Sequence, residues 1–127
     1  MVQVVAWDGD VAIGRGIVLL PEHEEYSVSA MREGCAEVRD VFVVFERRRS
    51  GVARAIMRSL EDAARANGMP RVGLAVSLSA DAEPARRLYQ ALGYRHAHGP
   101  FISSTTLAGD DGRLPVGSPM TYLVKEC

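Results

Sequence analysis

The stretch from Val41 to Ala55 combines a strand-like apolar run, a basic turn and the start of an amphipathic helix. It reads Val41-Phe-Val-Val-Phe-Glu-Arg-Arg-Arg-Ser-Gly-Val-Ala-Arg-Ala55. Gly51 lets a ligand approach the main chain, and the first backbone N–H groups of a helix have no partner within that helix. The helix dipole is positive at this end, so the segment predicts a phosphate or pyrophosphate site. A solvated basic turn before an ordinary helix is the alternative.

Arginines gather around this turn although the chain as a whole is nearly neutral. They are Arg47, Arg48, Arg49, Arg54 and Arg58, against a formal net charge of -1 for the whole chain. Such a run could also contact nucleic acid. No aromatic platform accompanies it and the overall charge is close to zero, so the phosphates of a small cofactor explain it better than nucleic acid.

Length and composition indicate a single soluble domain over residues 1–127. The chain has 47% apolar and 24% charged residues, which is typical of globular proteins. No segment approaches the roughly 20 apolar residues that span a bilayer, and no signal peptide is visible, so a cytoplasmic protein is expected. Cys35 and Cys127 lie in no metal-ligand spacing, and no metal site is predicted.

Hydrophobic periodicity predicts strands first and then an alternation of strands and helices. The expected strands are Val2–Trp7, Val11–Leu20, Ala36–Val44, Arg71–Ser77, Tyr94–Ala97 and Thr121–Lys125, and the expected helices run from Val52 to about Asn67 and from Asp81 to Leu92. In the strand that leads into the basic turn, simple alternation places Glu37, Arg39, Val41 and Val43 on one face.

Two connections lie outside these elements. Residues 22–34 are polar and predict a loop with, at most, a short helical turn. Residues 99–119 are rich in Gly, Ser and Thr, and Asp110-Asp111-Gly112 predicts that this insertion folds back as a hairpin.

Two motifs resemble those of the GNAT superfamily of N-acetyltransferases. Arg48, Gly51 and Ala53 match the signature Gln/Arg-x-x-Gly-x-Gly/Ala, and Ala85-Arg-Arg-Leu-Tyr-Gln-Ala-Leu-Gly-Tyr94 is similar to the second motif of the family. The resemblance covers Ala36–Tyr94 closely. It implies an α/β fold with a mixed, mostly antiparallel central sheet and flanking helices.

The resemblance also implies a cofactor and its contacts. Acetyl-coenzyme A (acetyl-CoA) would lie between two splayed central strands, and its acetyl group would pass to a primary amine of a small molecule or peptide. The backbone of the preceding strand would receive the acetyl and pantetheine portions, and the turn would surround the pyrophosphate, mainly through its amides. The residues concerned are Val41, Phe42 and Val43 on the strand and Arg48, Arg49, Ser50, Gly51, Val52, Ala53 and Arg54 in the turn and helix.

Catalytic roles follow from the same resemblance. In this family the amine usually attacks the thioester directly, so a base accepts a proton and an acid protonates the leaving thiolate. Tyr89 occupies the position often assigned to the acid, although a tyrosine packed for stability is the alternative. Glu37, eleven residues before Arg48, is the candidate base. An exposed carboxylate at the strand end, paired with Arg39 or a neighbour, is the alternative for Glu37, and a base role for Asp40 or a water relay also remains open.

The chain departs from the family pattern at several positions. It begins at what resembles the second strand of the fold, without the usual first strand and two helices. The acceptor site would then be reduced or completed by a partner, for example in a homodimer. Ala82 stands where many members have asparagine, and Ala75 stands at a common glutamate position. A non-catalytic acetyl-CoA sensor is therefore the alternative function.

Overall fold

The computed structural model describes residues 1–103 and 117–127. Its strands are β1 (Val2–Asp8), β2 (Val11–Leu19), β3 (Ala36–Val43), β4 (Arg71–Ser77), β5 (Arg95–Ser103) and β6 (Ser118–Glu126). Its helices are α1 (Val28–Glu33), α2 (Val52–Ala66) and α3 (Glu83–Ala91), with short 3-10 turns η1 (Phe45–Arg47) and η2 (Ala80–Ala82). The hairpin expected at 110–112 lies outside the described residues.

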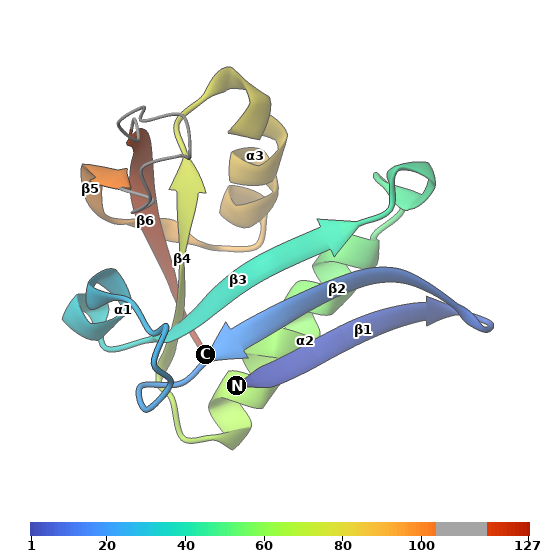
Figure 1. Cartoon of the computed structure of the whole chain (residues 1–127), viewed down its shortest axis with the longest axis horizontal. Helices are drawn as coiled ribbons and strands as arrows, with labels where there is room; N and C mark the ends of the chain where they lie inside the picture. The colour runs from blue at the N-terminus through green and yellow to red at the C-terminus, as the bar shows by residue number, and fades with distance from the viewer. Residues whose placement is uncertain (104–116) are drawn as a thin grey trace, which may run out of the picture. The chain divides into compact units, whose positions relative to one another are not determined.

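The six strands form one sheet in the order β1-β2-β3-β4-β6-β5 (Figure 1). β1 pairs with β2 and β2 with β3 in antiparallel fashion, whereas β3 and β4 are parallel. The predicted mixed α/β fold with a mostly antiparallel sheet is thereby confirmed. The described residues group into two compact units, Met1–Leu74 with Val124–Cys127, and Ala75–Leu123.

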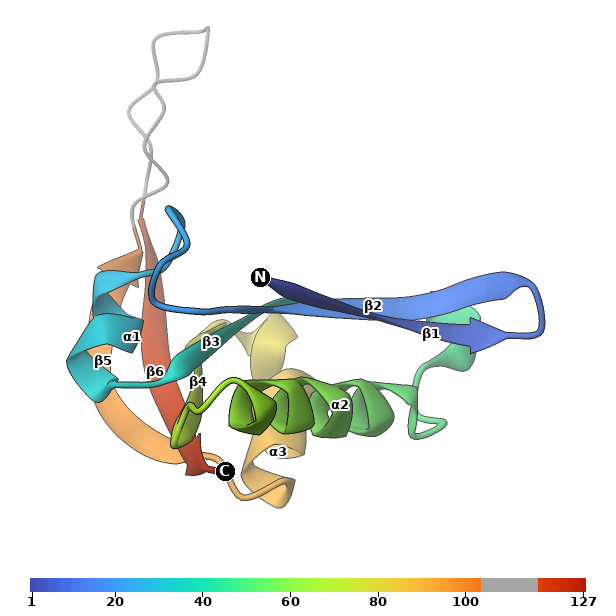
Figure 2. The same ribbon diagram turned by 90° about the horizontal axis from the view of Figure 1, so that it is seen from below.

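In the first unit, α2 lies along one face of β1, β2 and β3 (Figure 2). Its buried residues, Ile56, Met57, Leu60 and Ala64, recur at helical spacing. Two glycines of β2 allow the helix to approach closely. A Cβ on Gly14 would lie 2.8 Å from Ile56 Cδ1, and one on Gly16 would lie 2.9 Å from Leu60 Cδ1.

The C-terminal end of α2 follows the predicted stop signal. Asn67 caps the helix, its side-chain amide donates to the carbonyl of Ala63 at 2.8 Å, and Gly68 follows with a φ of 79°. Lys125 Nζ lies 3.0 Å from Glu61 Oε1 and joins the end of β6 to the same helix. The predicted helix and its end are confirmed.

The second unit is built around α3 and the strands β5 and β6. Arg86 Nη1 donates to the carbonyls of Ser77 at 2.6 Å and Ser79 at 2.8 Å, and so fixes the chain reversal before the helix. β5 is longer than predicted because its Gly99-Pro100 pair lies within the strand. β5 is an edge strand, where proline is tolerated.

Candidate functional site

A β-bulge interrupts β3 just before the basic turn. Arg15 pairs with Phe42 and Ile17 pairs with Arg39, so two residues of β3, Asp40 and Val41, oppose the single Gly16 of β2. Asp40 adopts a left-handed conformation with a φ of 56°. The bulge redirects every side chain that follows it on the strand.

The bulge corrects the predicted faces of β3. Leu19 pairs with Glu37 and Gly14 with Val43, and the two β2 residues are five apart, so they lie on opposite faces. The prediction that Glu37 shares a face with Val43 is therefore wrong. Glu37 instead shares its face with Phe42, because simple alternation fails where one strand carries an extra residue. Val43 lies on the face that packs against α2.

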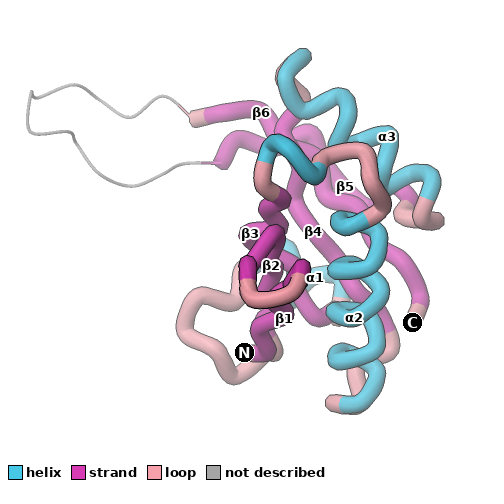
Figure 3. The backbone as a smooth tube through the Cα atoms, turned by 90° about the vertical axis from the view of Figure 1, so that its right-hand side faces the viewer, coloured by secondary structure: helices cyan, strands magenta, loops and turns pink. Residues whose placement is uncertain are grey.

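The turn after β3 is held by its own backbone. Val44 N–H donates to the carbonyl of Ile13 at 2.9 Å, and Arg48 N–H closes the η1 turn by donating to the carbonyl of Phe45 at 3.2 Å. The Ser50 hydroxyl donates to the carbonyl of Arg47. Figure 3 shows the resulting order of strand, short turn, loop and helix. These contacts carry the chain from β3 to the N-terminus of α2.

The N-terminus of α2 is open for an anion. Its N-cap is Gly51, with a φ of 86°, and among the described residues no side chain caps it and no acid stands in the first turn. A Cβ built on Gly51 would meet no atom within 4 Å, so space lies in front of the main chain. The unpaired amides of a first helical turn and the positive end of the dipole together favour a phosphate here.

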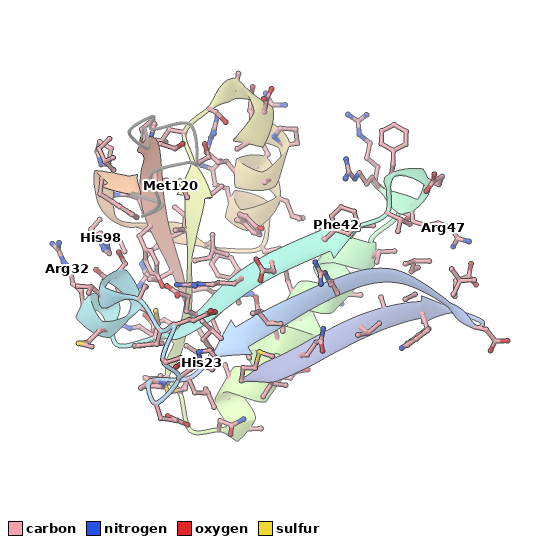
Figure 4. The ribbon with its side chains drawn as sticks, in the orientation of Figure 1. His23, Arg32, Phe42, Arg47, His98 and Met120 are labelled. Carbon is pink, nitrogen blue, oxygen red and sulfur yellow. The ribbon has the colours of Figure 1, made fainter. Side chains whose placement is uncertain are left out.

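The arginines of the turn differ in what they contact. Arg48 Nε donates to the carbonyl of Val43 at 3.0 Å, and its guanidinium lies 5.7 Å from the ring centre of Phe42 and 5.6 Å from that of Phe45. Arg47 forms an ion pair with Asp8 at the tip of the β1–β2 hairpin (Figure 4). Both side chains therefore brace the turn, although they are themselves exposed, and Arg49 and Arg54 are exposed beside them.

Glu37 is buried, with only 3% of its surface exposed, and its carboxylate contacts both Arg39 and Ser27. Arg39 Nη2 lies 2.8 Å from Oε1, and the Ser27 hydroxyl donates to Oε2. Ser27 is also the N-cap of α1, where its oxygen accepts from Ala30 N–H at 3.0 Å. The carboxylate thus joins α1 to β3. Glu37 is the second residue of β3 and is buried there, so the exposure expected for the structural alternative is wrong, whereas its pairing with Arg39 is confirmed.

A tyrosine lies beside this carboxylate. The Tyr26 hydroxyl donates to the carbonyl of Cys35. Burial, followed by the nearby Cys35 and Glu37, raises the pKa of Tyr26 to about 12. Sequence reasoning did not single out Ser27 or Tyr26, because both belong to a segment expected to be a loop. A serine directly before Val28, with Ala30 and Met31 following, was the available signal for an N-cap.

Tyr89 lies on α3 in the second unit. Its ring packs edge-on against Tyr94, with ring centres 6.0 Å apart, and its carbonyl accepts from Tyr94 N–H at 2.9 Å. Burial raises the pKa of the Tyr89 hydroxyl, so this group stays protonated throughout the neutral range. It has the protonation state that an acid requires, and also the packing that a structural tyrosine shows.

Two further properties bear on the kind of site. In residues 1–103 and 117–127, no group of three or more His, Cys, Asp and Glu side chains is arranged to hold a metal ion. No helix among the same residues combines the length and apolar character needed to cross a membrane.

Comparison with protein families gives one match over most of the chain. The model of the acetyltransferase (GNAT) family matches residues 2–94. An uncharacterized N-acetyltransferase of Bacillus subtilis strain 168, YsnE, is 27% identical over 96 residues, which are 76% of this chain and 56% of the relative. The chain therefore spans little more than half the length of that curated relative.

Solved structures share the fold at low sequence identity. A GNAT family acetyltransferase of Elizabethkingia anophelis, crystallised with acetyl-CoA bound, superposes with a TM-score of 0.68 at 14% identity, over 98% of this chain and 75% of that structure. The ribosomal-protein-S18-alanine N-acetyltransferase of Escherichia coli gives a TM-score of 0.67 at 18% identity, over 98% and 68%.

Proposed function

The chain belongs to the acetyltransferase (GNAT) family, and from that premise we propose that it moves the acetyl group of acetyl-CoA to a primary amine of a small molecule or peptide. Acetyl-CoA is the cosubstrate of this family and is bound in the Elizabethkingia structure. The Escherichia coli neighbour, which is named for an alanine acceptor on a ribosomal protein, supports an amine as the acceptor.

One observation carries the cofactor assignment. Within the part of the chain that the structure describes, the N-terminus of α2 has a left-handed glycine cap, no capping side chain and no acid in its first turn. A helix end of this kind, preceded by the arginine-rich turn, suits the pyrophosphate of coenzyme A. Backbone groups of Val41, Phe42 and Val43 would bind the acetyl and pantetheine portions, and the main chain from Arg48 to Arg54 would surround the pyrophosphate.

The proposed reaction needs one proton acceptor and one proton donor. The amine nitrogen attacks the thioester carbonyl, the bond between carbon and sulfur breaks, and the amide and free coenzyme A result. Glu37 is proposed as the base that accepts the proton from nitrogen, directly or through water. Tyr89 is proposed as the acid that protonates the thiolate.

Other properties are proposed on the basis of the sequence. They are one domain over residues 1–127, a cytoplasmic location, and a homodimer that completes the acceptor site. The length and composition of the chain support the single domain.

Calorimetric titration with acetyl-CoA, with desulfo-CoA and with acetylpantetheine, which lacks the pyrophosphate, as controls, tests the cofactor assignment. Saturable binding of acetyl-CoA that weakens strongly when the pyrophosphate is absent is the expected result, and absence of binding would refute it. Release of free thiol with a panel of primary amines then tests turnover. Binding without thiol release from any amine would favour a sensor over an enzyme.

A further inference from the structure

The charged residues of α2 are unevenly distributed along the helix. Its first half, from Val52 to Ser59, contains Arg54 and Arg58 and no acid. The two arginines are exposed, and because they are four residues apart they lie on the same side of the helix. This arginine pair therefore gives the exposed side of the first half a purely positive charge.

The acids of α2 lie in its second half and are engaged there. Glu61 Oε1 lies 3.0 Å from Lys125 Nζ. Asp62 forms an ion pair with Arg65. Neither side chain of the arginine pair has a hydrogen bond or an ion pair with another residue in the described part of the chain. Both guanidinium groups are therefore available to a ligand.

The arginine pair opposes the electrostatics of its own helix. Arg54 is the third residue of α2, where the positive end of the helix dipole disfavours a further positive charge. Like charges four residues apart also repel each other. A bound phosphate would turn both effects into attraction, because it places negative charge between the two guanidinium groups. A ligand therefore explains the pair better than helix stability does.

Coenzyme A carries a further phosphate, on the 3′ carbon of its ribose, besides the pyrophosphate. We propose that the side chains of Arg54 and Arg58 bind this 3′-phosphate. The amides of the first turn serve the pyrophosphate under the proposed function, and the inference rests on that function because it concerns the same cofactor. A guanidinium group donates two parallel hydrogen bonds to one phosphate, so a pair of arginines one turn apart suits a single doubly charged group. The protein then selects coenzyme A over its dephospho form.

Calorimetric titration with acetyl-CoA and with acetyl-3′-dephospho-CoA tests this selectivity. The unsubstituted protein is expected to bind acetyl-CoA at least about tenfold more tightly than the dephospho compound. In the double variant Arg54→Gln/Arg58→Gln this preference should fall below about twofold, because the guanidinium groups that distinguish the two compounds are gone. Arg65→Gln is the matched control, since Arg65 is exposed on the same helix and pairs with Asp62. It should keep the preference.

The outcomes separate this inference from the cofactor assignment. Equal affinities of the unsubstituted protein for the two compounds would overturn the 3′-phosphate assignment and leave acetyl-CoA as the cosubstrate. A preference that survives in the double variant would also overturn it, because other groups would then bind the 3′-phosphate. Absence of binding for both compounds would refute the cofactor assignment and this inference together. Without cofactor, the double variant should unfold at an unchanged or higher urea concentration, because it loses only the repulsion between the two arginines.

Discussion

Two substitutions at Gly51 can separate the effect of a negative charge on anion binding from the effect of the strained backbone. Its φ of 86° strains any other residue, but a Cβ there meets open space. Gly51→Glu and Gly51→Gln should lose similar stability, about 1 kcal/mol, from the left-handed backbone. Only the glutamate brings a negative charge to the N-terminus of α2.

We therefore expect Gly51→Glu to weaken acetyl-CoA binding at least about tenfold more than Gly51→Gln does, measured by calorimetric titration. The glutamine variant controls for bulk and strain. Equal affinities in the two folded variants would show that no phosphate approaches this turn.

Two roles are possible for Glu37, that of the general base and that of a structural link between α1 and β3. They can be distinguished because Glu37 and its partner Ser27 can be substituted separately. Glu37→Gln keeps the shape of the side chain but removes the proton acceptor, and turnover should fall about 100-fold. Ser27→Ala removes one hydrogen bond to Glu37 and the N-cap of α1. It should cost about 1 kcal/mol of stability and leave turnover largely intact. If the two variants lose stability alike and both keep turnover, Glu37 is a structural residue.

Tyr89 is tested by removing its hydroxyl. Tyr89→Phe keeps the ring against Tyr94, so acetyl-CoA affinity should hold while kcat falls about 100-fold. Burial raises the pKa of Tyr89 above the ordinary 10.0, so its proton is present at every pH below 10. If the activity of the unsubstituted protein falls below pH 10, the titration of a group other than Tyr89 causes the loss. An unchanged kcat in Tyr89→Phe would show that Tyr89 has a packing role and is not the acid.

At the scale of elements, the close contact of α2 with β2 depends on two glycines. A Cβ on Gly14 would lie 3.0 Å from the carbonyl oxygen of Phe42, a main-chain atom, besides the 2.8 Å contact with Ile56. At Gly16 the nearest atoms are all side-chain methyl groups. We expect Gly14→Ala to lower the free energy of unfolding by about 1–3 kcal/mol and Gly16→Ala by less. Urea denaturation measures both, and equal losses would contradict the role given to the Phe42 carbonyl.

Periodicity predicted most elements of the chain, because buried strands and amphipathic helices repeat at fixed intervals. It could not predict the bulge at Asp40 and Val41, since one extra residue on β3 leaves the composition of the strand unchanged. The faces of Glu37 and Val43 were therefore assigned wrongly. The turn from Arg48 to Gly51 was recognised because glycine and the following helix are local signals, whereas the Ser27 contact with Glu37 joins segments ten residues apart.

For the whole molecule, the chain path bears on whether residues 1–127 behave as one domain. The boundary between the two compact units falls within two strands, after Leu74 in β4 and after Leu123 in β6. β4 and β6 are each divided, so that each of these strands contributes residues to both units. Independent unfolding would require breaking these strands in the middle.

We therefore predict a single cooperative unfolding transition, in which the calorimetric and van't Hoff enthalpies agree. Acetyl-CoA at 100 times its dissociation constant should add about 2.7 kcal/mol to the free energy of unfolding and shift the transition as a whole. Two transitions, with only one shifted by acetyl-CoA, would show instead that the units unfold separately and that the cofactor binds within one of them.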